Sequence, residues 1–135
     1  MHYQTTLAGI DWQEMKARLA ADDFDNGRTA EQLQRSFEHS AATVVAHASG
    51  LPVGTARALS DGVCNAYVVD VWTFTPYRRR GIARRMMELL EERLAGQHVA
   101  LFAAAQAGSF YQGVGYQVEP GGLSKVVGTW LRTEP

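Results

Sequence analysis

The spacing of hydrophobic residues changes several times along this chain, and each change marks an expected element. In three segments the apolar side chains return every three or four positions, which is typical of amphipathic helices. Asp11 and Thr29 precede the first two segments as expected N-caps, and Gly96 is expected to end the third. A fourth, short helix is expected before Gly115. The expected helices cover residues 11–21, 30–39, 80–95 and 107–114.

Runs rich in β-branched and aromatic residues predict strands between these helices. The strongest run is AYVVDVWTF at 66–74, which Pro76 terminates. The run VALFA at 99–103 is apolar throughout, which favours a central strand. The expected strands cover residues 2–7, 43–48, 53–59, 66–74, 99–103, 116–119 and 123–129. This order of elements predicts an α/β fold, with one mixed sheet and helices packed on it.

The composition is that of a globular protein. The chain has 135 residues, of which 46% are hydrophobic and 20% charged, as expected for one domain covering residues 1–135. No segment approaches the roughly 18 apolar residues of a membrane span, and no secretory signal is visible at the N-terminus. Cys64 is the only cysteine, so an internal disulfide is not expected. We therefore expect a soluble, cytoplasmic protein.

The formal net charge of −1 argues against a general nucleic-acid binder, whose binding face carries a surplus of basic residues. The charges are nevertheless distributed unevenly. Residues 11–40 contain seven acids and four bases, whereas residues 78–93 contain six arginines and three glutamates. These opposite surpluses fit two ligands of opposite charge, and equally the solvated faces of helices.

Candidate chemistry concentrates in residues 68–85, where a strand ends, an arginine-rich turn follows and a long helix begins. Gly81 and Ala83 leave the backbone uncovered at the start of that helix, where free N–H groups and the helix dipole favour an anion such as phosphate. The alternative is a helix cap with surface arginines. The segment fits neither the P-loop pattern nor the dinucleotide-binding glycine pattern.

Two motifs resemble those of the GCN5-related N-acetyltransferase (GNAT) superfamily. Arg78-Arg79-Arg80-Gly81-Ile82-Ala83 resembles the core of the family's motif A, which is Gln/Arg-x-x-Gly-x-Gly/Ala between a long strand and a long helix. Ala107-Gly108-Ser109-Phe110-Tyr111-Gln112-Gly113-Val114-Gly115-Tyr116 resembles the family's A-x-x-F/L-Y-x-x-x-G-F/Y element. The two motifs have the family's order and spacing, and the resemblance covers residues 3–129.

The resemblance implies a mixed, mostly antiparallel sheet with helices on both faces, and acetyl-CoA as co-substrate. It implies that the amides of residues 79–84 bind the pyrophosphate and that the pantetheine arm pairs with the strand at 71–74. A backbone N–H near Thr73 would polarise the thioester carbonyl, and the acetyl group would pass directly to a primary amine, expected to be that of a small molecule, in a ternary complex. The implied cofactor-binding residues are Trp72, Thr73, Phe74, Arg78, Arg79, Arg80, Gly81, Ile82, Ala83, Arg84, Gln106 and Phe110.

Two residues are candidates for proton transfer. The resemblance places Tyr111 near the coenzyme sulfur, where its phenol can protonate the departing thiolate, and the alternative is a tyrosine packed beside Phe110. Asp70 is the one carboxylate inside an apolar strand and a candidate general base, and the alternative is a structural ion pair with an arginine such as Arg57. No pair of His, Cys or carboxylate residues has metal-ligand spacing, so no metal is expected.

The chain departs from the family pattern at two places. Ala104 stands where an asparagine often precedes the second motif, and Gln106 is the nearest amide that could contact the pantetheine. Pro76 lies one residue closer to the motif A arginine than is usual, which predicts a slightly different kink at the end of the strand.

The acceptor is expected on the side of the first two helices. An acidic wall there would attract a cationic amine, whereas Trp12, Phe24 and Phe37 would suit an aryl amine. The acids of this wall are Asp22, Asp23, Asp25, Glu31 and Glu38.

Two other classes of function stay open. One is a non-catalytic acyl-CoA-binding sensor, and the other is a nucleic-acid adaptor that uses the arginines of residues 78–85. Neither a nucleic acid nor a membrane is the expected partner. Dimers are common in the resembled family, so a homodimer also stays open.

Overall fold

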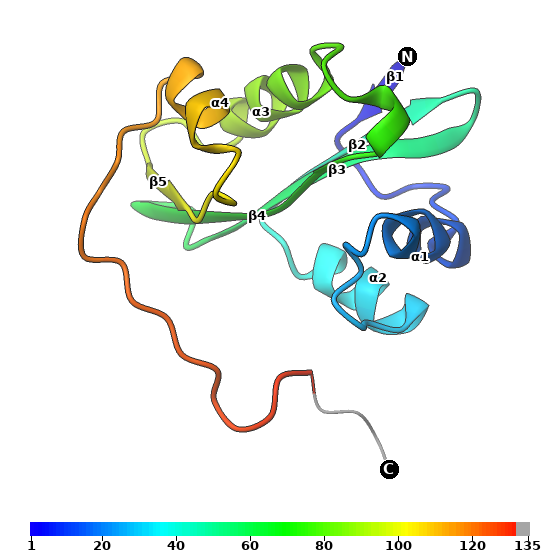
Figure 1. Ribbon diagram of the computed structural model, residues 1–135, viewed down its shortest axis with the longest axis horizontal. Coiled ribbons are helices and arrows are strands. Elements are labelled where there is room, and N and C mark those ends of the chain that lie inside the picture. Colours follow the sequence, from blue (N-terminus) through cyan, green and yellow to red (C-terminus); the bar gives the residue numbers. More distant parts are fainter. Residues whose placement is uncertain (132–135) are drawn as a thin grey trace. The chain divides into compact units, whose positions relative to one another are not determined.

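Five strands form one sheet in the first part of the chain, in the spatial order β1-β2-β3-β4-β5 (Figure 1). The computed structural model describes residues 1–131. The chain forms two compact units, Met1–Leu101 and a second unit that begins at Phe102. Neighbouring strands run antiparallel except β4 and β5, so the mixed, mostly antiparallel sheet is confirmed. The strands are β1 (His2–Gln4), β2 (Ala42–Ala48), β3 (Leu51–Ser60), β4 (Asn65–Thr73) and β5 (His98–Leu101).

The helices of this unit cover both faces of the sheet, as expected. Helices α1 (Trp12–Ala21) and α2 (Ala30–Glu38) lie on one face, and α3 (Ile82–Glu92) lies on the other (Figure 1). The predicted N-caps are confirmed, because the Asp11 carboxylate accepts the amide of Glu14 and Thr29 forms a capping box with Gln32.

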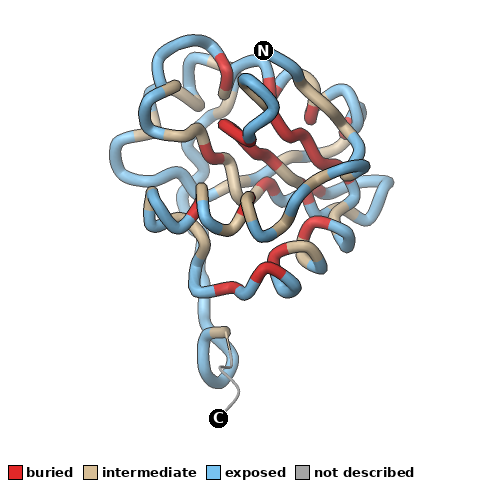
Figure 2. The backbone as a smooth tube through the Cα atoms, turned by 90° about the vertical axis from the view of Figure 1, so that its right-hand side faces the viewer, coloured by how far each residue is buried: buried red, intermediate tan, exposed pale blue. Residues whose placement is uncertain are grey.

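Two apolar layers hold the first unit together. Under α1 and α2, six buried side chains form one core cluster, Met15, Leu19, Leu33, Phe37, Val45 and Trp72. On the other face α3 buries Ile82, Met86, Met87 and Leu90 as it packs on β2, β3 and β4. In Figure 2 the buried positions lie mainly in neighbouring extended segments, and they alternate with exposed positions along a helix. Each such side chain contributes about 1.5–3 kcal/mol through its burial.

Strand β4 contains a β-bulge close to its end. Thr55 of β3 pairs with Trp72 of β4, and Arg57 of β3 pairs with Val69 of β4. Between these two pairs β3 advances by two residues and β4 by three. The extra residue lies on β4, and Asp70 there adopts a φ of +54°, which is unusual for a residue with a side chain. The hydroxyl of Thr55 donates to the Asp70 carbonyl at 2.8 Å, which satisfies a backbone group that the bulge removes from the ladder.

The second unit contains α4 (Gly108–Gly113), which confirms the short helix. The strands expected at 116–119 and 123–129 are wrong, because the described residues after α4 contain no strand and residues 117–130 are exposed. Pro120 has no N–H to donate to a ladder, and Gly121 and Gly128 have positive φ, which interrupts an extended chain.

The central position expected for the strand at 99–103 is also wrong. Within the described residues β5 pairs with β4 alone, and its side chains alternate between exposed and half-buried. Phe102, directly after β5, is 65% exposed. The apolar run lacks the second neighbouring strand that a central position needs, because the two strands expected later in the chain do not form.

Candidate active site

The second half of β4 has an open edge. On its β5 side β4 is paired only from Asn65 to Val68, whereas on its β3 side the pairing continues to Thr73. Within the described pairing, the backbone of residues 69–73 therefore faces no strand on the β5 side, and the bulge lies in this stretch. An open edge can pair with an extended chain through backbone hydrogen bonds, and a pantetheine arm carries amides suited to this.

The open edge leads into a turn with an unusual backbone. A 3-10 turn, η1 (Thr75–Tyr77), follows β4 and contains Pro76. Arg79 and Gly81 then adopt φ values of +64° and +81°. Gly81 is the N-cap of α3 and supplies no side-chain acceptor, unlike the caps of α1 and α2. The first N–H groups of α3 are therefore available to an anion, which the helix dipole also favours.

Four exposed arginines surround this helix start, and two of them have fixed contacts. Arg78 donates from Nε to the carbonyl of Thr73 at 3.1 Å. The guanidinium of Arg80 lies over the ring of Tyr77, 5.0 Å from its centroid. The four arginines are Arg78, Arg79, Arg80 and Arg84.

Two of the expected cofactor-binding residues can offer only their backbone. The side chains of Trp72 and Ile82 are 2% and 3% exposed and belong to the two apolar layers. Phe74 is half-buried, and the guanidinium of Arg18 lies 4.3 Å from the centroid of its ring. Trp72 therefore takes part in the core through its indole, which packs under α1 and α2.

The end of β4 is also held by a residue that the sequence patterns did not single out for this position. Asp22, the C-cap of α1, accepts three hydrogen bonds from Trp72 and Thr75. Burial raises the pKa of Asp22, but the hydrogen bonds from Thr75 and Trp72 lower it by more, so its pKa lies below the ordinary value. The carboxylate is therefore ionised at neutral pH and acts here as an acceptor.

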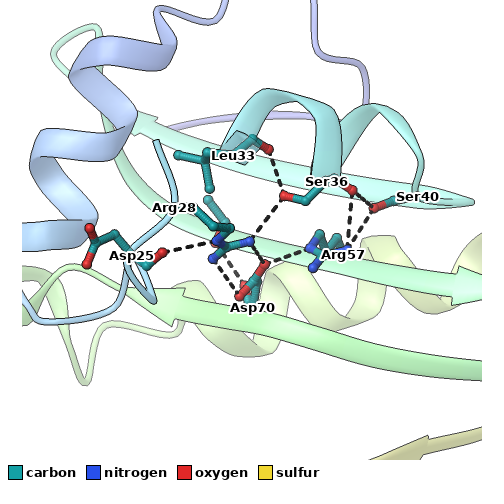
Figure 3. A network of polar contacts seen from close by, with 8 residues as sticks. Asp25, Arg28, Leu33, Ser36, Ser40, Arg57 and Asp70 are labelled. Atoms are coloured by element: carbon teal, nitrogen blue, oxygen red, sulfur yellow. Dashed lines mark hydrogen bonds and ion pairs between the residues drawn. The ribbon is translucent and has the colours of Figure 1, made fainter. Parts of the chain in front are cut away.

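Asp70 lies between two arginines (Figure 3). Arg28 donates to both of its carboxylate oxygens, at 2.8 and 3.1 Å, and Arg57 donates from Nε at 2.6 Å. Burial raises the pKa of Asp70, but the hydrogen bonds and charges of the two arginines lower it by more, so its pKa lies below the ordinary value. The geometry is that of the structural ion pair with Arg57 that was the alternative to a general base.

The arginines are bonded in turn to the loop before α2 and to the end of α2 (Figure 3). Arg28 donates to the Ser36 hydroxyl at 3.1 Å and to the Asp25 carbonyl at 3.0 Å. Arg57 donates to the Ser36 carbonyl and to the Ser40 hydroxyl, each at 3.3 Å. No local pattern in the sequence marks Arg28 as the partner of Asp70, because 42 residues separate them.

The expected acidic wall is smaller than the sequence suggests. Asp22 is engaged as described, and Asp25 forms an ion pair with Lys16 at 2.8 Å. The hydrogen bond and charge of Lys16 lower the pKa of Asp25. Three of the five acids, Asp23, Glu31 and Glu38, are exposed. Of the three aromatic candidates, Phe37 is a core residue with its ring 5.4 Å from that of Trp12, whereas Trp12 and Phe24 are half-buried.

The second unit contains the remaining candidates. The ring of Tyr111 packs edge-on against Phe110 and Tyr116, with centroid distances of 5.0 and 5.8 Å. Burial raises the pKa of Tyr111, so its phenol is protonated at neutral pH. The contact with Phe110 is the packing alternative, and it leaves the predicted general-acid role open. Gln106 is exposed in the turn before α4.

Most of the chain matches one known protein family. Residues 12–128 match the acetyltransferase (GNAT) domain model. This chain belongs to the GNAT family. Acetyltransferases with this fold use acetyl-CoA, in line with the open edge and uncapped helix start described above. Among the described residues no group of three potential metal ligands occurs, and none of the described helices is long and apolar enough to cross a membrane.

Three known proteins place this GNAT domain among its relatives. Serotonin N-acetyltransferase 2, chloroplastic, from Oryza sativa subsp. japonica is 35% identical over 69% of the chain, and the match spans only 50% of that relative's length. A crystal structure from Deinococcus radiodurans R1, of a protein assigned as an acetyltransferase, has a TM-score of 0.80 and 25% identity over 92% of this chain and 87% of that one. A protein assigned as an acetyltransferase from Clostridium acetobutylicum, solved with acetyl-CoA, shares the fold with a TM-score of 0.65 at 18% identity, over 93% of this chain and 95% of that one.

The predicted site residues of the GNAT domain fall into two groups. Those of β4, the turn and the start of α3 are consecutive along one path in the first unit, whereas Gln106, Phe110 and Tyr111 belong to the second unit. The sequence patterns did not mark Arg28, and they placed Asp22 only in an acidic wall. The signal for Asp22 was its position directly after α1, where a carboxylate has to find donors outside its own helix.

Proposed function

We propose that this GNAT domain transfers an acetyl group from acetyl-CoA to a primary amine of a small molecule. The observation that carries the proposal is one continuous backbone path. The open edge of β4 at residues 69–73 leads through η1 to the uncapped start of α3 at Gly81. The path offers backbone donors for an extended amide-bearing arm and then for a pyrophosphate, which is the chemistry of coenzyme A.

The helix start binds the pyrophosphate in this proposal. The amides of residues 79–84 donate to its oxygens, and the exposed arginines add charge and further donors. A side chain at Gly81 would meet no atom of the chain within 4 Å, so the space above the backbone is open to a ligand. Its φ of +81° also favours glycine at this position.

The end of β4 orients the reacting group. The backbone N–H of Thr73 polarises the thioester carbonyl, where negative charge develops as the amine attacks. The amine nitrogen forms a bond to the acetyl carbon, the carbon–sulfur bond breaks, and the electron pair leaves on sulfur. Tyr111 gives its phenolic proton to that thiolate, and the proton lost by the amine passes to water. No covalent bond to the protein forms, because both substrates are bound together.

Asp70 takes no proton in this mechanism. Both of its oxygens accept hydrogen bonds from arginines, and a lowered pKa makes it a weaker base than an ordinary aspartate. We assign it to the support of the β4 bulge instead. The direct transfer step then depends on positioning by the backbone and on Tyr111.

The acceptor that fits best is a cationic aryl amine. Trp12 and Phe24 are half-buried aromatic residues on the side of α1 and α2, and Asp23, Glu31 and Glu38 add exposed negative charge. The name of the rice relative, a serotonin N-acetyltransferase, supports an aryl amine, although the match spans only 50% of that protein's length. The same relative is named as chloroplastic, and a cytoplasmic location for this chain stays a prediction.

The test is release of free CoA thiol in the presence of amines. We expect release from acetyl-CoA to depend on an added amine, and serotonin to be a better acceptor than a polyamine or an anionic amine such as glutamate. A polyamine preference would contradict the aryl part of the proposal, and a preference for glutamate would contradict its charge. Binding of acetyl-CoA without release by any amine would instead favour the non-catalytic sensor.

A further inference from the structure

We propose that Asp22 is a positioning residue that sets the geometry of the acetyl-CoA site from the end of helix α1. Its carboxylate spans about fifty positions of sequence to reach the end of β4. Oδ2 accepts from the Trp72 indole Nε1 at 2.9 Å and from the Thr75 amide at 3.0 Å, and Oδ1 accepts from the Thr75 hydroxyl at 2.8 Å. The proposal rests on the function proposed above and adds a residue that does not itself touch the substrate.

The two partners of Asp22 bracket the reacting end of the strand. Thr73 and Phe74 lie between Trp72 and Thr75, so a carboxylate bound on both sides restricts the backbone around the Thr73 amide. The same stretch is held from β3 by the hydrogen bond from the Phe74 amide to the Val53 carbonyl at 2.8 Å. Arg78 holds the Thr73 carbonyl from the far side of the turn. Removal of the Asp22 contacts releases the side toward α1.

A second contact from the same helix supports this role. Arg18 lies one turn before Asp22 on α1, and its guanidinium lies 4.3 Å from the centroid of the Phe74 ring. The last turn of α1 therefore contacts three successive points, which are the indole of Trp72, the ring of Phe74 and the backbone of Thr75. A helix end that served only to connect to α2 would not need contacts to each of these residues.

The loop that carries Asp22 is itself fixed at its other end. Residues 22–29 connect α1 to α2, and Arg28, near the end of this loop, forms the paired hydrogen bonds to Asp70 at the β4 bulge. The loop is therefore attached to β4 at two points, at Asp70 in the bulge and at Trp72 near the end of the strand. Asp22 acts from a fixed backbone, so a change in its side chain displaces the end of β4 rather than the loop.

Asp22→Asn is the sharpest variant, because it keeps the size of the side chain and replaces one acceptor oxygen with an NH2 donor. If the NH2 takes the place of Oδ2, it faces the indole N–H of Trp72 and the amide N–H of Thr75. If it takes the place of Oδ1, the Thr75 hydroxyl has to turn and accept instead of donating. In both cases the negative charge that strengthens the three hydrogen bonds is lost. Glu92→Gln is the control, because it makes the same change from carboxylate to amide at an exposed residue at the far end of α3. Thr75→Val removes only the hydroxyl contact and tests the same anchor from an exposed position.

The measurements are the Kd of acetyl-CoA by calorimetry, KM and kcat with a saturating amine, and the midpoint of thermal unfolding. We expect Asp22→Asn to raise the Kd and KM for acetyl-CoA on the order of tenfold and to lower kcat as well, in protein that is still folded at the assay temperature. Thr75→Val should change them in the same direction by less. Glu92→Gln should bind acetyl-CoA as the wild type does.

A purely structural role would lower the unfolding midpoint of Asp22→Asn while leaving Kd, KM and kcat unchanged below it, and that result would overturn the proposal. If Asp22→Asn does not fold, unchanged kinetic constants in Thr75→Val overturn it instead. A wild-type protein that does not bind acetyl-CoA would contradict the proposed function itself. The two failures can be told apart, because the positioning role is tested only when the wild type binds acetyl-CoA and the variant is compared with it.

Discussion

Arg28 binds Asp70 through both terminal nitrogens of its guanidinium, with hydrogen bonds of 2.8 and 3.1 Å to the two carboxylate oxygens. The side chains of Arg28 and Asp70 are only 7% and 9% exposed. Arg57 binds the same carboxylate from the neighbouring strand, so two cations share one anion in a largely dry environment. Such a cluster adds little net stability when complete, because burying the charges offsets their attraction. Its loss is costly, because the remaining charges have no partner.

Asp70→Asn is therefore expected to destabilise the fold by about 3–5 kcal/mol, since it leaves Arg28 and Arg57 buried without a counter-charge. Denaturant unfolding followed by circular dichroism measures the difference in the free energy of unfolding. Asp23→Asn, at an exposed position, serves as a control that should stay within about 0.5 kcal/mol of wild type. A loss below about 1 kcal/mol in Asp70→Asn would contradict a structural role for the cluster.

The acid dependence of stability follows from the same contacts. The pKa of Asp70 is lowered from its ordinary value of 3.8, so the folded state favours the ionised form. The ionised Asp70 contributes fully to the free energy of unfolding at pH values above its pKa in the unfolded chain, which is about 4. This contribution is lost as the pH falls from there through the lower pKa of the folded state. We expect the free energy of unfolding to decline below about pH 4. Asp70→Asn should lack this part of the decline, and parallel pH curves for the two proteins would contradict the assignment.

Local patterns account for the elements that were predicted correctly. Asp11 and Thr29 cap helices through residues three positions away, and such contacts are visible in the sequence. The bulge at Asp70 and its contact with Arg28 join segments far apart in the chain, so no spacing rule reaches them. Asp22 was similarly visible only as a charge, because its donors lie on β4 and η1.

The incorrect predictions have the same origin. An apolar run such as that of β5 shows that a strand is favoured, but the number of its neighbours depends on whether later segments join the sheet. Residues 116–119 and 123–129 have side chains that suit strands. In the described part of the chain, however, they pair with no strand of the sheet. Sheet position is therefore a property of the assembled fold, whereas helix capping is a property of a few consecutive residues.

Tyr111→Phe tests the general acid. Removing the phenolic proton should lower kcat by about 10²- to 10⁴-fold while leaving the Kd of acetyl-CoA nearly unchanged. Tyr3→Phe, on β1, is the control and should keep the wild-type kcat. Equal activity in Tyr111→Phe and wild type would assign Tyr111 to packing beside Phe110.

The pH dependence of kcat gives a second test of Tyr111. Burial raises the pKa of this phenol above its ordinary value of 10.0, so the acid form persists through neutral and mildly alkaline pH. We expect kcat to show no loss attributable to this group below about pH 10. A titration of the wild-type rate near pH 8 that is absent in Tyr111→Phe would contradict the expected protonation state.

The central claim is that acetyl-CoA binds where β4 leads into α3, and calorimetry on the wild type and Gly81→Glu tests it most directly. Gly96→Glu is the matched control, because Gly96 has a similar φ of +83° and lies beyond the other end of α3, and because a Cβ added there, as at Gly81, would have open space within 4 Å. The account predicts that wild type and Gly96→Glu bind acetyl-CoA, whereas Gly81→Glu does not, because the glutamate puts negative charge where the pyrophosphate binds. Equal binding by Gly81→Glu and Gly96→Glu, or no binding by the wild type, would contradict the account.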